Sequence, residues 1–545
     1  MHTMPAPDVS VVFNIHRESP YIRRTVSSLN EAAAHAAAAS IRCELIVVFD
    51  RSDALTMDVT RGAQADAFAS IRYIEVDHGS LGLARNSGIA VAEGEYVWLA
   101  DADDLVSYNS LSAMHAVAKE DPDAVVFPEY LIAFGEACWV ARYYDDSVVT
   151  TADFVYEHPY ISRIFLRRQH LEGMVFHDLR LSSGFAYEDW HFNCELRARG
   201  MRFRVASQTF LFYRQRKGSL LRQANAVSVG QIPHAALFAP ETFSMHVAQE
   251  ESDPSRAERD TRRDAARSVN SVAEMMGDKV CRNMLVAANH IDPGVNISLI
   301  SNAGNAWTNV FPNRHWGHDY AQACALVGGW KFSDVMLLPF LGAGGGEKYI
   351  LDVLRALASG DPGFRCLVIS GETAQGHVWL DRLPSNATFL DVFNAFPWLG
   401  EHERDLLVLR LVTAVVGEGA RLHLKASPFA QRWFGKFSSA IGHLTRPIYY
   451  RFSDARVPFH GSLVESGWSF DFLSTEIPNI TWVISDHERI VEDDRRRIGV
   501  HGHKWHCLYA AHVAGEAVCR EGPAFRLLWA SRLSPSKRPR ASALA

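Results

Sequence analysis

The first 130 residues alternate between short apolar runs and segments with helical periodicity, and this alternation constrains the fold more than any other feature. The apolar runs occupy residues 9–15, 43–49, 71–76, 96–100 and 124–128. Strands that alternate with helices are typical of a mostly parallel sheet with helices on its faces. We therefore predict an α/β fold in which ligands bind beyond the carboxyl ends of the strands.

The length of 545 residues indicates more than one domain. Residues 246–280 are rich in charges of both signs and poor in apolar side chains, which is typical of an exposed helical linker. We predict a first domain over 1–245, this linker over 246–280, and a second, Rossmann-like α/β domain over 281–525. The last segment, 526–545, is predicted to begin a further lobe.

The net charge of −7 predicts no nucleic-acid partner. An anionic ligand would then need local help from a metal ion, an arginine or a helix N-terminus. The eight cysteines form no C-x-x-C pair, which indicates reduced thiols in a cytoplasmic protein. No apolar stretch approaches the roughly 20 residues that cross a bilayer, so we predict at most peripheral contact with a membrane.

Three carboxylates, Asp101, Asp103 and Asp104, follow the apolar strand at 96–100. Asp101 and Asp103 are two residues apart, so an extended chain points both to the same side. Carboxylate oxygens at a strand end suit Mg²⁺ or Mn²⁺, with phosphate oxygens completing the shell. The alternative is a solvated acidic turn ahead of a helix near Tyr108.

Two other polar clusters come from segments far along the chain. Glu188 and Asp189 begin a helix that ends near Gly200, and the helix dipole alone favours acids there. A basic group after a strand contains Arg214, Arg216 and Lys217, and a solvated basic loop is the alternative.

Residues 8–220 resemble the family-2 glycosyltransferases, which have the GT-A fold. The resemblance rests on the order and spacing of four segments: the opening strand with its loop at 9–18, the second strand at 44–52, the Gly-containing A-R-N-x-G segment at 79–88, and D-x-D at 101–104. It implies a nucleoside-diphosphate sugar donor, a divalent metal and an inverting transfer. The second strand departs from the family pattern because Asp50 is the only acid left at its end.

The resemblance also implies residue roles. Asp189, preceded by Glu188, would be the general base, and Asp103 with Asp101 would organise the metal. Donor-binding positions carried over from the family are His16, Glu18, Asp50, Arg85, Asp101, Arg214, Arg216 and Lys217. A helix N-terminus is expected to keep the Asp189 carboxylate ionised.

The second half contains a glycine loop at 342–346 that fails the phosphate-loop pattern because Glu347 precedes the lysine. Residues 280–540 resemble, more weakly, the amino-terminal half of family-4 glycosyltransferases, which have the GT-B fold. Arg532 and Lys537 would be the donor-phosphate residues of a second lobe that the chain leaves truncated.

The resulting hypothesis is an inverting, metal-dependent hexosyltransferase that acts in cell-surface polysaccharide synthesis, of the O-antigen or capsule type, as part of a bifunctional polymerase. Its acceptor would be a saccharide or a lipid-linked saccharide, and its location the cytoplasm, at the inner face of the membrane. Two alternatives stay open: a nucleotidyltransferase that makes sugar nucleotides, and a non-catalytic assembly module.

Overall fold

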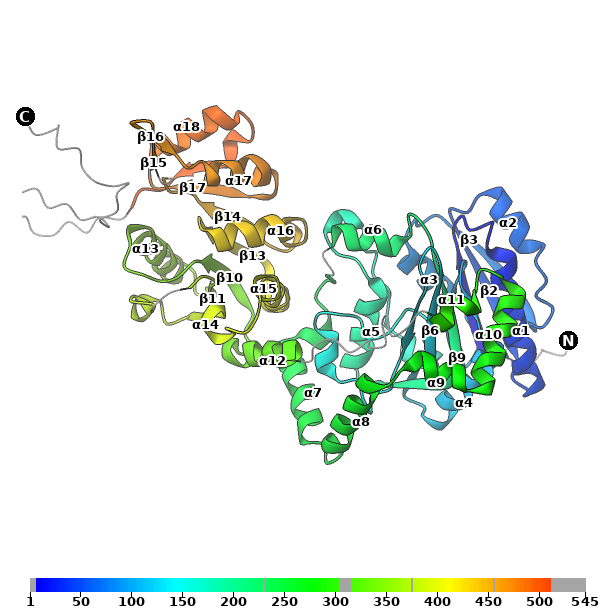
Figure 1. Cartoon of the computed structure of the whole chain (residues 1–545). Helices are drawn as coiled ribbons and strands as arrows, with labels where there is room; N and C mark the ends of the chain where they lie inside the picture. The colour runs from blue at the N-terminus through cyan, green and yellow to red at the C-terminus, as the bar shows by residue number, and fades with distance from the viewer. Residues whose placement is uncertain (1–5, 229–230, 303–314, 374–375, 454–455, 511–545) are drawn as a thin grey trace, which may run out of the picture. The chain divides into compact units, whose positions relative to one another are not determined.

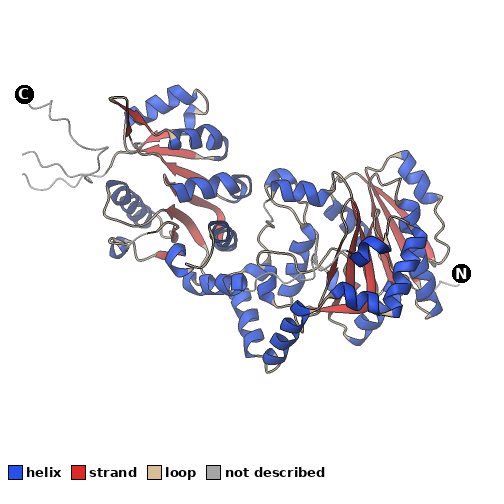
Figure 2. Cartoon of the chain, in the orientation of Figure 1, coloured by secondary structure: helices blue, strands red, loops and turns tan. Residues whose placement is uncertain are grey.

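Strands and helices alternate from the start of the chain as predicted (Figures 1 and 2). The computed structural model describes residues 6–228, 231–302, 315–373, 376–453 and 456–510. The first elements are β1 (Val9–Ile15), α1 (Ile22–Ala38), β2 (Cys43–Asp50), α2 (Ala54–Arg61), β3 (Ser70–Val76), α3 (Leu81–Ala90) and β4 (Tyr96–Asp101). The apolar runs become strands because every residue of β1 and β2 is buried.

The first sheet has the order β3-β2-β1-β4-β8-β6-β9-β5, with β7 paired to β6. Strands β3, β2, β1 and β4 are parallel, and β8 runs antiparallel to β4 and β6. Asn14 of β1 lies opposite Asp101 of β4, so both strands end at the same edge. The added elements are β5 (Leu105–Val106), α4 (Ser110–Glu120), β6 (Ala124–Gly135), β7 (Trp139–Arg142), β8 (Phe165–Arg167), α5 (Glu188–Ala198), β9 (Arg202–Gln215) and α6 (Leu220–Val227).

Helix α3 packs directly on β1 and β2. A Cβ atom on Gly88 would lie 2.3 Å from Val12 Cγ1 and 2.9 Å from Val48 Cγ2, so only glycine allows this approach. The close packing places the start of α3 beside the carboxyl edge of the sheet.

Residues 240–302 differ from the predicted exposed linker. They form α7 (Pro240–Ser252), α8 (Arg256–Ser268), α9 (Ser271–Gly277), α10 (Lys279–Ile291) and α11 (Ile297–Asn302). Met275, Leu285 and Ile300 share one apolar core with Tyr130 of β6 and Phe210 of β9. Buried apolar residues recur about once per turn on α7 and α10, whereas α8 buries Arg259, Arg263 and Ala266. The division into compact units accordingly falls between Ala321 and Gln322.

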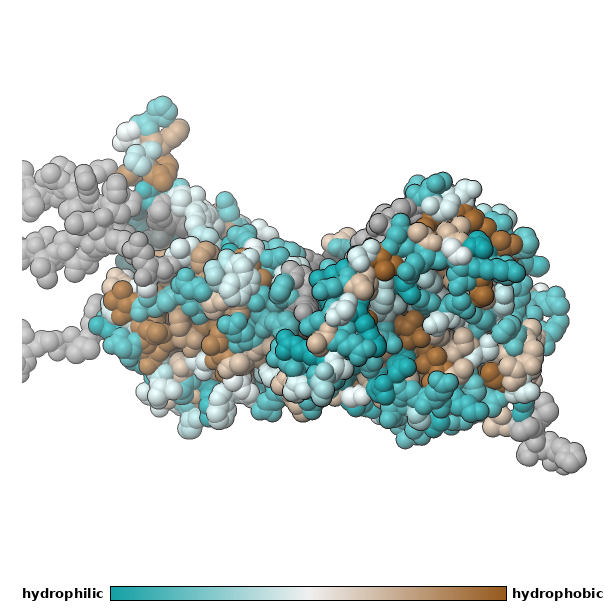
Figure 3. Space-filling model, turned by 60° about the horizontal axis from the view of Figure 1, so that its bottom comes forward, coloured by the Kyte–Doolittle hydropathy of each residue, from teal (hydrophilic) through white to brown (hydrophobic). Residues whose placement is uncertain are grey.

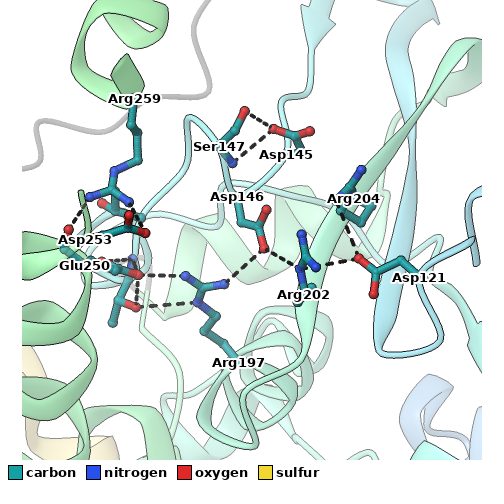
Figure 4. A network of polar contacts seen from close by, with 12 residues as sticks. Asp121, Asp145, Asp146, Ser147, Arg197, Arg202, Arg204, Glu250, Asp253 and Arg259 are labelled. Atoms are coloured by element: carbon teal, nitrogen blue, oxygen red, sulfur yellow. Dashed lines mark hydrogen bonds and ion pairs between the residues drawn. The ribbon is translucent and has the colours of Figure 1, made fainter. Parts of the chain in front are cut away.

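A network of ion pairs holds α7 against α5 and the adjoining strands, as Figure 4 shows. Arg197 of α5 pairs with Glu250 of α7 at 2.6 Å and faces Asp146 at 4.0 Å. Arg202 extends the network to Asp121 at 3.3 Å. The network ties the carboxyl half of α5 in place, and the opposite end of that helix carries Glu188 and Asp189.

The second unit contains a seven-stranded sheet of order β12-β11-β10-β13-β14-β17-β18, in which every pairing is parallel. The strand order reverses between β10 and β13, as in doubly wound folds. Its strands are β10 (Phe332–Leu338), β11 (Cys366–Ser370), β12 (Ala387–Asp391), β13 (Val416–Lys425), β14 (Arg446–Tyr450), β17 (Trp482–Ser485) and β18 (Trp505–Cys507). A separate hairpin pairs β15 (Arg456–Phe459) with β16 (Ser462–Glu465).

The helices of this unit are α12 (His315–Val327), which crosses the division, α13 (Gly345–Gly360), α14 (Val392–Ala395), α15 (Glu401–Val415), α16 (Pro428–Leu444), α17 (Trp468–Glu476) and α18 (Glu488–Ile498). Its core includes a buried ion pair between Asp334 and His423, 2.8 Å apart. Two α/β units with mostly parallel sheets confirm the predicted fold class.

The visible face in Figure 3 is mostly hydrophilic, with hydrophobic residues in smaller groups. Within the part of the chain that the structure describes, no helix combines the length and apolar character needed to span a bilayer. The segment 526–545 that was predicted to begin a further lobe, with Arg532 and Lys537, lies outside the described residues.

Candidate functional site

The three carboxylates after β4 have different surroundings. Asp101 is ion-paired with Arg163 and lies 3.3 Å from Arg85. Asp104 is buried, pairs with Arg163 through one oxygen and accepts the backbone N–H of Arg214 through the other at 2.9 Å. Asp103 pairs with Arg216, whose Nε lies 2.7 Å from Oδ2.

These contacts separate the three pKa values. Burial raises the pKa of Asp101, but Arg163 and Arg85 outweigh it, so the net shift is downward. Burial raises the pKa of Asp104 to about 7 in spite of Arg163. Burial also raises the pKa of Asp103, against the opposing effect of Arg216.

Arg163 is a site residue that the sequence analysis missed. It lies just before β8, its side chain is 4 % exposed, and it bridges Asp101 and Asp104. A lone arginine in an irregular segment carries no pattern that would mark it in the sequence. Asp101, Asp103 and Asp104 form what we call the acidic edge, and the contacts of Arg163 with two of these acids make it part of that edge.

Arg85 joins the acidic edge to the Glu188–Asp189 pair. Its guanidinium is 1 % exposed, lies 2.8 Å from Glu188 Oε1 and 3.3 Å from Asp101 Oδ2. Residues 85, 101 and 188, from α3, β4 and α5, therefore meet at one place. The guanidinium predicted to hold a donor phosphate is held here between two carboxylates.

Asp189 lies in the first turn of α5 and its side chain is 25 % exposed. Its Oδ1 accepts the backbone N–H of Trp190 at 2.9 Å. Burial raises the pKa of Asp189, and the opposing effects of Arg85 and the Trp190 N–H do not cancel it. The helix N-terminus was expected to dominate; burial does instead, which moves the carboxyl towards the range of a base that works near neutral pH.

Asp50 ends β2 and organises the loop that precedes α3. Its carboxylate accepts the backbone N–H groups of His78 and Gly79 at 2.8 Å and of Ser80 at 3.0 Å. Gly79 has φ of +59°, a conformation that glycine adopts without strain. The carboxylate predicted to bind the donor thus serves as an anchor for this loop.

His16 and Glu18 follow β1 and contact the same region. His16 Nδ1 donates to the backbone carbonyl of Asp50 at 2.6 Å. Glu18 accepts the His16 backbone N–H at 2.7 Å and lies 3.3 Å from Arg216. The ends of β1, β2 and β9 are thereby connected.

The three predicted cations after β9 have separate environments. Arg214 is buried, donates to the Asp103 carbonyl at 2.9 Å, pairs with Asp292 and lies 4.4 Å from the Phe134 ring centroid. Arg216 is 35 % exposed, between Asp103 and Glu18. Lys217 is 90 % exposed. Arg216 and Lys217 are accessible to a ligand, whereas Arg214 is committed to the fold.

Whether a cation fits depends on the donor set. Among the described residues, no three His, Cys, Asp or Glu side chains group closely enough to hold a metal ion by themselves. Mg²⁺ in phosphate-binding sites takes one or two carboxylates and fills its shell with phosphate oxygens and water. Asp103 fits this pattern because its side chain is 16 % exposed and its partner Arg216 is itself 35 % exposed.

The glycine loop of the second unit leads into α13, whose N-cap is Gly344. Glu347 in the first turn pairs with Lys425 at the end of β13, 3.1 Å away. The loop therefore lies where the strand order reverses, and the negative charge of Glu347 is neutralised by Lys425 of the same unit.

Comparisons with known proteins find glycosyltransferases that are similar to part of the first unit. Residues 10–181 match the model of Glycosyl transferase family 2. Glycosyltransferase GlyG of Streptococcus pneumoniae is 24 % identical over 242 residues, 39 % of this chain and 73 % of GlyG. The poly(ribitol-phosphate) beta-N-acetylglucosaminyltransferase TarP of Staphylococcus aureus is 26 % identical over 125 residues, 22 % of this chain and 36 % of TarP.

The putative glycosyltransferase EpsH of Bacillus subtilis is 27 % identical over 127 residues, 23 % of this chain and 34 % of EpsH. The chain thus spans about a third of the lengths of TarP and EpsH. Among solved structures, S. aureus TarS 1–349 in complex with UDP-GlcNAc matches with a TM-score of 0.31 and 16 % identity, over 58 % of this chain and 88 % of that one.

Proposed function

We propose that the first unit transfers a sugar, with inversion, from a nucleoside-diphosphate sugar to a saccharide or lipid-linked saccharide in cell-surface polysaccharide synthesis. The match to the family-2 model over residues 10–181 supports the reaction class. The observation that carries the site is Arg85, which joins Asp101 to Glu188 and so brings Asp189 near the acidic edge.

In the proposed reaction, Asp189 takes the proton of the acceptor hydroxyl while that oxygen attacks the anomeric carbon. The bond between this carbon and the diphosphate oxygen breaks, and the nucleoside diphosphate leaves. Only one base is needed, because a single displacement inverts the configuration. A bound Mg²⁺ or Mn²⁺ would neutralise charge on the departing diphosphate, with Asp103 as its protein ligand.

Arg216 and Lys217 are the proposed diphosphate-binding cations. Arg216 already spans Asp103 and Glu18 at the site edge, and Lys217 is exposed beside it. Arginine can pair with phosphate oxygens in a bidentate way. We propose that donor binding draws Arg216 away from Asp103, which frees the Asp103 carboxylate for the metal.

The relatives suggest the donor and the acceptor class. The name of TarP includes poly(ribitol-phosphate), and TarS 1–349 was solved in complex with UDP-GlcNAc. For this chain we propose a sugar-nucleotide donor and a glycan acceptor without choosing the sugar. We place the reaction in the cytoplasm, at the inner membrane face; the seven described cysteines are free, as in a reducing compartment.

We propose that the second unit is the amino-terminal lobe of a second, GT-B-type glycosyltransferase in a bifunctional polymerase. The all-parallel sheet and the glycine loop at its strand-order reversal support this proposal. Ligands in such sheets bind at that reversal. Protection of residues 342–346 from hydrogen exchange by a nucleotide sugar or glycan would support it, and unchanged exchange would oppose it.

The test of the first unit uses purified full-length protein with nucleoside-diphosphate sugars, Mn²⁺ and saccharide acceptors. We expect release of nucleoside diphosphate that depends on the acceptor, with an inverted anomeric product by NMR. Asp189→Asn should lower kcat by about 10³-fold or more while donor binding persists.

Two other outcomes would point to a different function for the first unit. Pyrophosphate released from a nucleoside triphosphate and a sugar phosphate would indicate a nucleotidyltransferase. Folded protein that releases no nucleoside diphosphate with any donor would contradict the proposal and favour an assembly role.

A further inference from the structure

His158 lies beside Asp189, in the irregular segment between the 3₁₀ turn Thr151–Phe154 and β8. Its Nδ1 is 3.7 Å from Asp189 Oδ2, and its side chain is 15 % exposed. The imidazole stacks nearly parallel to the Trp190 indole, with an interplanar angle of 11° and centroids 6.3 Å apart. The ring therefore presents one nitrogen edge to the carboxylate.

Asn193 determines which ring nitrogen carries the proton. It lies one helical turn after Asp189, and its Nδ2 is 2.8 Å from His158 Nε2 and 3.2 Å from the Ile161 carbonyl oxygen. The reversed amide would place its oxygen against that carbonyl, so the nitrogen faces both partners. Since an amide nitrogen only donates, Nε2 must accept, and the proton resides on Nδ1, facing Asp189.

The imidazole is a neutral donor. Burial lowers the pKa of His158 to about 3, so the ring carries no charge at neutral pH. It therefore does not compete with Asp189 for the acceptor proton. The other ionisable groups that interact with Asp189 are Arg85, Asp101, Glu188, Tyr143 and Tyr187.

Among these groups Arg85 is the only cation, and it is shared between Asp101 and Glu188. Asp189 Oδ1 is occupied by the Trp190 N–H. His158 thus faces Oδ2 with its ring N–H, and Nδ1 lies 3.7 Å from that oxygen.

We propose that His158, oriented by Asn193, is a positioning residue that donates to Asp189 Oδ2 and holds this carboxylate towards the acceptor hydroxyl. The proposal rests on the proposed function of Asp189 as the base. At 3.7 Å the contact is longer than a hydrogen bond, and we expect it to shorten when the acceptor binds, as contacts of catalytic groups commonly do.

The kinetic test compares four variants and one control variant in the acceptor-dependent transfer assay. His158→Phe keeps a planar ring without the donor, and we expect kcat to fall about 10- to 100-fold, the range for residues that orient a catalytic group, with donor KM unchanged. Because a carboxylate that loses a donor is harder to ionise, the acid limb of kcat/KM should move to higher pH. His158→Gln, which keeps an N–H donor, should recover most of the rate.

Asn193→Leu should reproduce the His158→Phe effects, and the double variant should be no slower than His158→Phe alone, because both act through one contact. His170→Phe is the matched control: His170 lies 3.6 Å from Asp123 and takes no part in the site. Circular dichroism and donor binding check that each variant folds.

A second readout needs no activity. In ¹⁵N-histidine NMR spectra, the signal absent from His158→Phe should show the neutral Nδ1–H tautomer between about pH 5 and 8. A His158 that titrates in this range, or that carries its proton on Nε2, overturns the proposal. If His158→Phe transfers sugar with the rate and pH profile of the wild type, the proposal is also overturned, but the proposed base role of Asp189 stays intact. Absence of transfer by wild-type protein overturns both.

Discussion

At the scale of single residues, Asp103 and Asp104, which follow β4, have different roles. Asp104 has both oxygens committed to Arg163 and to the Arg214 backbone, and it is 3 % exposed. Asp103 pairs with the partly exposed Arg216 and is 16 % exposed. The Asp104 carboxylate therefore stabilises the fold, whereas the Asp103 carboxylate is available to a ligand.

Substitution should separate these roles. We expect Asp103→Asn to weaken Mn²⁺-dependent donor binding by about tenfold or more, with the free energy of unfolding changed by less than about 1 kcal/mol. Asp104→Asn should instead lower the free energy of unfolding by about 1.5–3 kcal/mol, because a buried charge-assisted hydrogen bond is lost. Calorimetric titration and urea unfolding measure the two quantities. Wild-type donor and metal affinity in Asp103→Asn would contradict the assignment.

The Glu188–Asp189 pair predicts how activity depends on pH. Burial raises the pKa of both carboxyls, and their mutual repulsion adds to the shift of Glu188. The proposed base, Asp189, must be ionised to take a proton from the acceptor. We therefore expect kcat/KM to fall as pH falls through a value above the ordinary aspartate pKa of about 3.9.

Glu188→Gln removes the neighbouring negative charge and leaves Arg85 to interact with fewer carboxylates. We expect the acid limb of kcat/KM to move to lower pH in this variant. A limb that stays in place or moves to higher pH would show that the pair does not set the profile.

At the scale of elements, the loop before α3 depends on a residue of β2. Three consecutive N–H groups, at residues 78, 79 and 80, bond to the Asp50 carboxylate. We expect Asp50→Ala to raise the donor KM severalfold with a small change in kcat, because the loop loses its anchor. If Asp50 only anchors the loop, the increase should be equal for different nucleobases, whereas a direct contact would make it base-dependent. Asp77→Ala is the control, because the Asp77 carboxylate is 84 % exposed beside the same loop.

The strands could be predicted because a buried parallel strand is a continuous apolar run, and β1 and β2 are such runs. The carboxyl ends of the predicted strands then indicated Asp50, Asp101 and Asp103 as candidate site residues. Arg163 and His158 could not be found in this way. Both lie in the irregular stretch between β7 and β8, where the path of the chain depends on long-range packing rather than on a local period.

At the scale of the whole molecule, the boundary of the first unit was the least predictable feature. Charge-rich composition indicated a linker at 246–280, yet Arg263 of α8 is a buried partner of Asp153, at 2.6 Å. Composition counts charges without showing which are paired inside the fold. The first unit therefore includes the helices up to the first part of α12.

This boundary can be tested by shortening the chain. Asp292, after α10, pairs with the buried Arg214 and lies 2.9 Å from Arg24. Met275 and Leu285 complete the core around Tyr130. A chain that ends at residue 245 would leave Arg214 without its carboxylate and expose this core.

We expect residues 1–327, which keep α12 whole, to unfold cooperatively and to retain donor binding within about threefold of the full chain. Residues 1–245 should aggregate or lack a cooperative transition, because an unpaired buried cation alone costs about 3–5 kcal/mol. Thermal unfolding followed by circular dichroism distinguishes the two. Equal stability of both fragments would mean that α7 to α11 pack on the first sheet without supporting it, and would restore the boundary near residue 245.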